Sequence, residues 1–258
     1  MIFDTHAHYD DERFEEDRDA LITSMPGRGV GTIINVGASI ESTKTTLALS
    51  EKYPFVYAAV GVHPSDISGL NEETFAWLKE QTKKEKVAAV GEIGLDYHWP
   101  EPKPALQKQW FRRQIELAKE VKLPIIVHSR DAAEPTMQII QETKAYECGG
   151  VIHCYSYSPE MAEEYVKMGF FIGMGGVLTF KNAKKLVRCA ERIPLSSIVL
   201  ETDCPYMAPE PNRGKRNDSS QLIYVAQKLA EIKGITAEEV KQVTTENAHR
   251  LYRLTQNK

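Results

Sequence analysis

The sequence has 258 residues, of which 42% are hydrophobic and 26% are charged. This balance is close to that of average globular domains and excludes a disordered or fibrous chain. The formal net charge of -4 argues against a protein that coats duplex nucleic acid with a broad basic surface. A nuclease with a local metal site remains compatible with this charge, because divalent ions supply positive potential themselves.

The chain shows no targeting or membrane segment. Its first residues run straight into an apolar stretch, without the basic and apolar regions of a secretory signal. No apolar run approaches the roughly 18 residues that a membrane span needs. The four cysteines form no C-x-x-C pair, which indicates reduced thiols. We therefore expect a soluble cytoplasmic protein that has no membrane partner.

Short β-branched runs alternate with longer amphipathic stretches along the whole chain, which is the pattern of βα units. The runs predict eight strands at residues 2–4, 32–36, 56–60, 87–90, 125–127, 151–152, 170–172 and 198–200. Helical spacing of apolar residues predicts a helix over 106–121, and a further helix is expected over 219–233. A last helix follows Thr236, which forms a capping box with Glu239.

Eight such units and one extra C-terminal helix predict a single α/β domain over residues 1–258, a (β/α)8 TIM barrel of the usual length of roughly 250 residues. The alternative is an open, doubly wound sheet. No G-x-G-x-x-G motif follows any predicted strand, so the usual reason for that fold is missing, and no organic cofactor is expected.

Polar residues of metal-ligating type stand at the ends of the predicted strands, where barrels of this kind build their active sites. On the first strand, His6 and His8 are two residues apart, so both imidazoles point to the same face. Four more strand ends carry Glu92, His128, His153 and Asp203. A single strand-end histidine is more often structural, but six such residues at equivalent positions predict a shared metal site.

The donor set indicates which ions would bind. Neutral imidazoles and carboxylates suit Zn, Mn, Ni or Fe better than Ca. A bridging carboxylate such as Glu92 could hold two ions about 3.5 to 4 Å apart. His63 follows the third strand and faces the same end of the predicted barrel, so it is a candidate for substrate contact. His249 is expected to be structural, and His98 is left open.

Five motifs occur in order along the chain and identify a family. They are Asp4-Thr5-His6-Ala7-His8, Gly91-Glu92-Ile93-Gly94-Leu95-Asp96-Tyr97, Pro124-Ile125-Ile126-Val127-His128-Ser129-Arg130, His153-Cys154-Tyr155-Ser156 and Glu201-Thr202-Asp203-Cys204-Pro205-Tyr206. A sixth, Thr244-Thr245-Glu246-Asn247-Ala248, extends the likeness to the C-terminal part. Together they resemble the TatD family of metal-dependent deoxyribonucleases.

The resemblance implies a two-metal hydrolase whose ligands are His6, His8, Glu92, His128, His153 and Asp203. It implies Mg or Mn, with Zn or Ni as further occupants, and a 3'-to-5' exonuclease acting on DNA and sometimes on RNA. In this scheme His6, His8 and Asp203 hold one ion, His128 and His153 hold the other, and Glu92 bridges them. Asp203 is the first candidate for general base and His63 the next.

Residues beside the ligands are candidates for supporting roles. Asp4 and Glu201 could accept the distal ring proton of a ligating histidine, and a buried structural role is the equally favoured alternative. Strand alternation should turn the side chains of Cys154 and Cys204 away from the metals, as packing residues. Candidate phosphate-binding residues are Arg130, Arg213, Lys215 and Arg216. Candidate stacking residues for single-stranded bases are Tyr97, Trp99, Tyr155 and Tyr206.

Two other functions stay open. The first is a metal-dependent hydrolase of another ester or amide, such as an aminoacyl-tRNA ester or a small molecule. The basic segment from Arg213 to Arg216 favours phosphate over these. The second is a binding module that has lost turnover, which would ordinarily lack a ligand, and none of the six is missing. The motifs leave the oligomeric state open, with a monomer as the simplest arrangement.

Overall fold

The computed structural model describes residues 1–254, in which eight parallel strands form one sheet in sequence order. The strands are β1 (Ile2–Ala7), β2 (Val30–Val36), β3 (Val56–Val60), β4 (Val87–Asp96), β5 (Ile125–Arg130), β6 (Gly150–Ile152), β7 (Phe171–Met174) and β8 (Ile198–Leu200). The last strand returns to the first, where the amide of Asp203 donates to the carbonyl of His6 at 2.9 Å. This contact nearly closes the sheet into the predicted (β/α)8 barrel.

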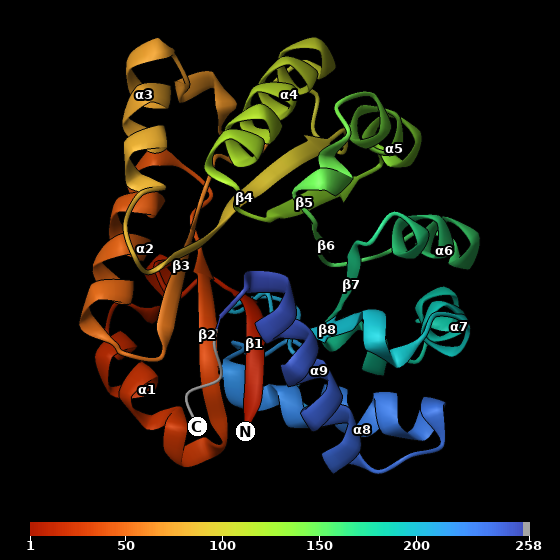
Figure 1. The fold of residues 1–258 in the computed structure, drawn as a ribbon. Helices are drawn as coiled ribbons and strands as arrows, with labels where there is room; N and C mark the ends of the chain where they lie inside the picture. The colour runs from red at the N-terminus through yellow and green to blue at the C-terminus, as the bar shows by residue number, and fades with distance from the viewer. Residues whose placement is uncertain (255–258) are drawn as a thin grey trace.

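Helices surround the strands as an outer layer (Figure 1). They are α1 (Arg18–Ser24), α2 (Ile40–Lys52), α3 (Glu72–Gln81), α4 (Pro104–Val121), α5 (Ala133–Glu142), α6 (Pro159–Lys167), α7 (Lys184–Arg192), α8 (Leu222–Lys233) and α9 (Ala237–Tyr252). Short 3-10 helices lie in the connections at Glu12–Phe14, Pro26–Arg28, Ile67–Gly69, Ala145–Glu147, Gly176–Thr179, Leu195–Ser197 and Ser219–Gln221. The extra C-terminal helix is α9, and its capping box between Thr236 and Glu239 is present as predicted.

The predicted strands are confirmed, but β4 is longer than its apolar run suggested. The run ends at Val90, whereas the strand continues to Asp96. Every residue of β4 is buried, because β3 and β5 flank it and its polar side chains point into the barrel end. Gly94 permits the close pairing with β5, since a Cβ there would lie 1.9 Å from the carbonyl oxygen of His128.

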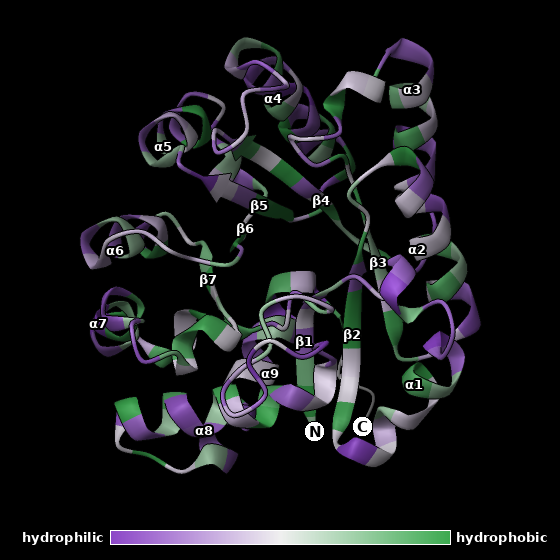
Figure 2. Ribbon diagram, turned by 180° about the vertical axis from the view of Figure 1, so that it is seen from behind, coloured by the Kyte–Doolittle hydropathy of each residue, from purple (hydrophilic) through white to green (hydrophobic). Residues whose placement is uncertain are grey.

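The core lies between the barrel and its helices. The largest buried cluster joins β4 to β8 with the inner faces of α4 to α8. Figure 2 shows the same division, with hydrophobic colour along the strands and mixed or hydrophilic colour on the outer helices. No helix among residues 1–254 is long and apolar enough to cross a membrane. All four cysteines are free thiols, in agreement with the sequence-based expectation.

Candidate metal centre

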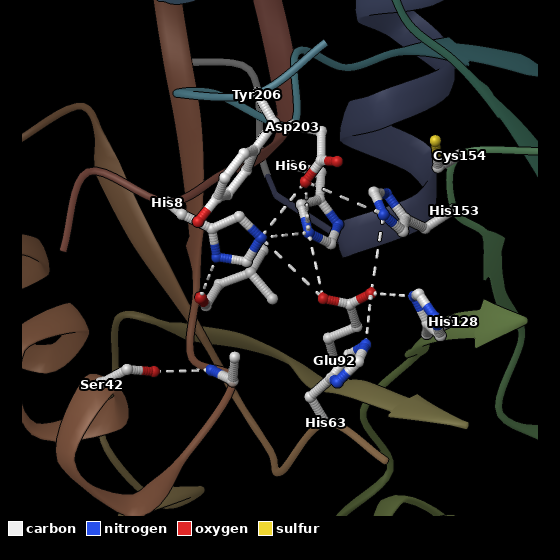
Figure 3. A network of polar contacts seen from close by, with 12 residues as sticks. His6, His8, Ser42, His63, Glu92, His128, His153, Cys154, Asp203 and Tyr206 are labelled. Atoms are coloured by element: carbon white, nitrogen blue, oxygen red, sulfur yellow. Dashed lines mark hydrogen bonds and ion pairs between the residues drawn. The ribbon is translucent and has the colours of Figure 1, made fainter. Parts of the chain in front are cut away.

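The six predicted ligands converge at the carboxyl end of the barrel strands (Figure 3). Nε2 of His6 lies 3.0 Å from Nε2 of His8, and Nε2 of His8 lies 3.4 Å from Oδ1 of Asp203. These three residues have donor atoms within 4.8 Å of one another, so they could hold one cation. This is the grouping that the sequence predicted for the first ion.

Glu92 lies between two sets of imidazoles. Its Oε2 faces Nε2 of His6 at 3.5 Å and Nε2 of His8 at 3.9 Å. Its Oε1 faces Nδ1 of His128 at 2.7 Å and Nε2 of His153 at 3.6 Å. Each carboxylate oxygen thus serves a different side of the cluster, which is the geometry that a carboxylate bridging two metal ions requires.

The second group of donor atoms differs from the predicted one, in which His128 and His153 hold the second ion. The donor atoms of His128 and Glu92 form a compact group with His63, whose Nε2 lies 3.9 Å from Oε1 of Glu92. The rings of His128 and His153 are farther apart, with 6.3 Å between their centroids. His63 therefore belongs to the second group of donor atoms. The sequence had predicted a contact between this residue and the substrate.

Outer partners orient three of the imidazoles. Nδ1 of His8 lies 2.9 Å from the carbonyl oxygen of Val36. Nδ1 of His153 lies 3.2 Å from Oε1 of Glu201, although the contact is not aligned as a hydrogen bond. Such partners fix the ring and raise its basicity as a ligand. Glu201 thus takes the orienting position proposed for it, and Gly173 leaves room for its carboxylate, since a Cβ there would lie 2.3 Å from Oε2.

Asp96 is an orienting residue that the sequence analysis missed. Its Oδ2 lies 3.1 Å from Nε2 of His128, which leaves Nδ1 of that ring facing Glu92. The signal was present in the sequence, because Asp96 is four residues after Glu92. Even spacing on one strand places both carboxylates on the same face. It was overlooked because the predicted strand ended too early.

Asp4 occupies the structural position instead of the orienting one. Its carboxylate accepts hydrogen bonds from Oγ1 of Thr202 and Oγ of Ser219, each at 2.6 Å, and does not contact the ring of His6. Burial raises the pKa of Asp4 to about 7 against the lowering effect of these hydrogen bonds. Nδ1 of His6 is buried without a hydrogen-bond partner in the described structure. Asp4 therefore joins β1 to the segment after β8.

The expectation that Cys154 turns away from the cluster is wrong. Its sulfur lies within 4.8 Å of the donor atoms of His153 and Asp203. The reason is local: β6 ends at Ile152, and Cys154 has a left-handed φ of 43°, so strand alternation does not extend to it. Cys204 behaves as expected and is fully buried in the apolar cluster around β1 and β2.

The charges of the cluster favour a cation. Burial alone would raise the pKa of Glu92, but the facing imidazoles of His153, His63 and His6 hold it well below its usual value. Burial would lower the pKa of His8, yet Asp203 outweighs this and raises it to about 9. The carboxylates therefore hold protons on imidazoles in the metal-free protein. A divalent cation placed among the same atoms would take the position of those protons.

His63 differs from these imidazoles. Burial and the neighbouring His128 lower its pKa to about 3, so the ring is neutral at working pH. Its Nδ1 lies 2.6 Å from Oγ of Ser65. A neutral ring with one nitrogen so engaged leaves the other available to a ligand or a proton.

The cluster lines a pocket of about 280 Å³ that is open to solvent. Three carboxylates form part of its rim: Asp10, Asp11 and Asp66. Burial raises the pKa of Asp10 despite the nearby His8. With Glu92 and Asp203, the lining contains five carboxylates beside four imidazoles. A substrate anion would therefore depend on bound cations to enter the pocket.

The predicted phosphate-binding residues do not line this pocket. Arg216 makes a two-pronged ion pair with Asp17 at 2.8 and 2.6 Å. The guanidinium of Arg213 lies over the ring of Phe180, 4.2 Å from its centroid. Nζ of Lys215 lies 3.4 Å from Oδ1 of Asn212. These side chains contact other residues of the chain instead of the pocket. The patterns that predict strands and helices do not reveal such contacts.

Arg130 differs from the other three, although it does not line the pocket either. It ends β5, is exposed, and stands two residues after His128. Burial raises the pKa of the Cys154 thiol, and the positive charge of Arg130 partly opposes this rise. Arg130 is therefore at the same end of the barrel as the cluster and is the remaining candidate of this set for contact with a phosphate.

The four predicted stacking residues differ in their exposure and in whether they line the pocket. Tyr155 is buried, and Tyr97 packs against the core. Trp99 is 55% exposed but does not line the pocket. Tyr206 is 41% exposed and does line it.

The two remaining histidines do not line the pocket. His98 pairs with Asp131 at the surface, and His249 packs edge-on against Phe3.

Comparison with known proteins gives consistent matches over the full length. The sequence model of the family described as "TatD related DNase" matches residues 3–253. The chain is 46% identical over 254 residues to the "Uncharacterized metal-dependent hydrolase YabD" of Bacillus subtilis (strain 168), covering 98% of this chain and 100% of the relative. It is 34% identical to the "Uncharacterized metal-dependent hydrolase YcfH" of Escherichia coli (strain K12), covering 98% and 96%.

A solved structure agrees with these relatives. The crystal structure of YJJV, a TATD homolog from Escherichia coli k12, superposes with a TM-score of 0.92 at 33% sequence identity. The match covers 98% of each chain. This chain therefore shares the fold of that homolog.

Proposed function

This chain belongs to the TatD family of metal-dependent hydrolases, and on that premise we propose that it cleaves phosphodiester bonds of DNA as a 3'-to-5' exonuclease with a preference for single strands. The observation that carries the proposal is the position of Glu92, with one carboxylate oxygen toward His6 and His8 and the other toward His128 and His153. RNA is a further substrate under the same mechanism.

The six residues would hold two divalent ions, with Mg, Mn, Zn and Ni as candidates. The donor chemistry fits, because four imidazoles and two carboxylates converge at one place. Bound there, divalent ions would activate a water and neutralise charge on the phosphoryl oxygens. Glu92 would contribute one oxygen to each ion site. The contacts of Asp96 and Glu201 would orient the rings of His128 and His153.

Asp203 would act as general base. Burial would raise its pKa, but the hydrogen bond with His8 and the charges of the nearby imidazoles hold the pKa below the usual value, so the carboxylate is ionised. It retains 19% of its side-chain exposure, which allows contact with an attacking water. A proton removed from that water would pass to Oδ1 or Oδ2. His63, neutral and at the same pocket, is the second candidate for this role.

A second candidate function is supported by the acidic rim. Asp10, Asp11 and Asp66 would attract a substrate with an ammonium group, such as the aminoacyl ester of a transfer RNA. The basic segment that favoured phosphate over such substrates does not line the pocket. We further propose a cytoplasmic location, because all four thiols are free as in a reducing compartment.

An activity screen tests these alternatives. Metal-stripped protein is reloaded with one ion at a time and assayed against single-stranded DNA, duplex DNA, RNA, p-nitrophenyl esters and an aminoacyl-tRNA. The proposal expects the highest kcat/KM on single-stranded DNA, with product release from the 3' end. Cleavage of the carboxylic esters alone would contradict it and support the second candidate. Equal or faster cleavage of blunt duplex would remove the single-strand preference.

A further inference from the structure

Tyr206 stands out among the residues that line the metal pocket. It is the one phenol or indole ring among the described lining residues, and it lies beside His8 and Asp203 in Figure 3. Tyr206 lines the same pocket as His8, Glu92 and Asp203, so a molecule bound at the metal cluster lies near this ring. An exposed aromatic face at that place calls for a flat partner.

Two contacts hold the Tyr206 side chain, and a third holds its backbone. Its hydroxyl donates to Oδ2 of Asp11 at 2.7 Å. Its backbone carbonyl accepts from Nδ2 of Asn217 at 2.8 Å, and Asn217 is itself fully buried. The guanidinium of Arg13 lies over the ring, 4.7 Å from the centroid. Because the ring is fixed before any ligand binds, stacking on it costs little conformational entropy.

The guanidinium of Arg13 lies over the ring, and Tyr206 as a residue is still 41% exposed. A cation over an aromatic ring is a favourable contact in itself. The exposed part of Tyr206 can meet a second planar group. The acidic rim around it disfavours a phosphate at this point, so the neutral, flat part of a substrate fits better than the charged part.

We propose that Tyr206, backed by Arg13, is the stacking platform for the nucleobase of the terminal nucleotide, next to the phosphodiester at the metal cluster. This inference rests on the proposed nuclease function and names the group that the pocket selects. Base stacking tolerates any sequence, because every base has a flat face. It also requires an unpaired end, since a base in a duplex is covered by its neighbours.

The test couples a change in the protein to a change in the substrate. The metal-loaded enzyme is assayed on an eight-residue oligothymidylate and on the same strand with an abasic 3'-terminal residue. In the wild type, loss of the base should lower kcat/KM by about fivefold to 150-fold, the usual range for one stacked base. In Tyr206→Leu, the same loss of the base should have little further effect, because the partner ring is gone.

Two control variants separate stacking from other roles. Tyr206→Phe keeps the ring and loses only the hydroxyl bonded to Asp11, so it should retain the wild-type dependence on the base. Trp99→Leu removes an exposed aromatic outside the pocket and should also behave as wild type. Equal losses by Tyr206→Leu on the intact and abasic strands would overturn the proposal, as would no loss at all.

A binding readout distinguishes failure of the platform from failure of the nuclease. A 3'-terminal 2-aminopurine, whose fluorescence falls on stacking, is mixed with metal-loaded protein in a stopped-flow instrument and followed before turnover. Quenching that disappears in Tyr206→Leu supports the platform even if no phosphodiester is cleaved. Cleavage without any Tyr206-dependent quenching supports the nuclease and overturns the platform.

Discussion

The two ends of the barrel carry hollows of different size and different chemistry. The larger, about 530 Å³, lies at the amino end between α9 and the first strands. The smaller, about 280 Å³, lies at the carboxyl end and contains the imidazole and carboxylate cluster. Size alone would select the wrong one. Convergent donor atoms and the strongly shifted pKa values of the cluster make the smaller hollow the candidate site.

Charged residues are present at both ends, but only one set faces inward. Glu238, Lys241 and Glu246 line the larger hollow from α9. Glu238 makes an exposed ion pair with Lys241, a contact of small energetic weight. At the carboxyl end, the side chains come from separate strands and point at one another. Strand ends thus concentrate function, whereas a helix face mainly interacts with solvent.

The largest effect is expected from removing the bridge between the two donor sets. Glu92→Ala should lose metal and hydrolysis together, because each oxygen faces a different group of imidazoles. Activity should fall by about 10³-fold, the upper end of the range for losing one electrostatic contact in an active site. Elemental analysis and turnover measure this. Glu246→Ala, at the amino end, is the matched control and should change neither. Full metal content in Glu92→Ala would contradict the bridging role.

Asp203→Asn should separate binding from chemistry. The amide keeps the shape and one oxygen ligand but no longer takes a proton. Metal and substrate should remain bound while kcat falls by roughly 10²- to 10⁴-fold. Steady-state kinetics with metal analysis gives the answer. Near wild-type kcat would leave Asp203 as a ligand only and would move the role of base to His63.

Asp96→Asn tests the orienting contact to His128. Loss of such a partner typically weakens metal affinity by about 10- to 100-fold. The measurement is competition for the metal with a chelator of known affinity. Asp131→Asn is the control, since Asp131 pairs with the exposed His98 at 3.4 Å. An unchanged affinity in Asp96→Asn would show that the ring of His128 is held by packing alone.

The stabilisation that metal gives should increase with pH, because the stabilisation by bound protons decreases. The pKa values of His8 and His153 are raised to about 9 and about 10, so their protons stabilise the metal-free protein below pH 6.5. That stabilisation is lost as pH rises toward 9 and 10. A metal must displace these protons, so its addition should raise Tm more at pH 9 than at pH 6, by about 2 to 4 °C per kcal/mol of binding energy. Thermal unfolding at both pH values checks this, and a larger shift at pH 6 would contradict it.

The smallest effect is expected from Arg213→Ala. The sequence alone made Arg213 a candidate for phosphate binding, but the guanidinium lies on Phe180 and not in the pocket. A change in KM below about twofold is now expected, as for surface substitutions away from special features. Arg130→Ala, at the end of β5, is the comparison variant. A tenfold rise in KM for Arg213→Ala would contradict this expectation and indicate that Arg213 contacts the substrate.

The sequence by itself determined the barrel and the principal cluster. Alternation along a strand places His6 and His8 on one face, and the carboxyl ends of parallel strands must meet at one end of a closed sheet. These are local and topological rules, so they hold before any side chain is packed. The same rule would have found Asp96, had the predicted β4 been extended past Glu92.

Only the tertiary structure decided which neighbours each polar side chain takes. Arg216 is engaged by Asp17, and Asp4 by Thr202 and Ser219, although all of these are far apart in the sequence. The sulfur of Cys154 approaches the cluster because a left-handed residue interrupts the strand pattern. Such contacts depend on loop paths and side-chain competition across the fold, and no period in the sequence encodes them.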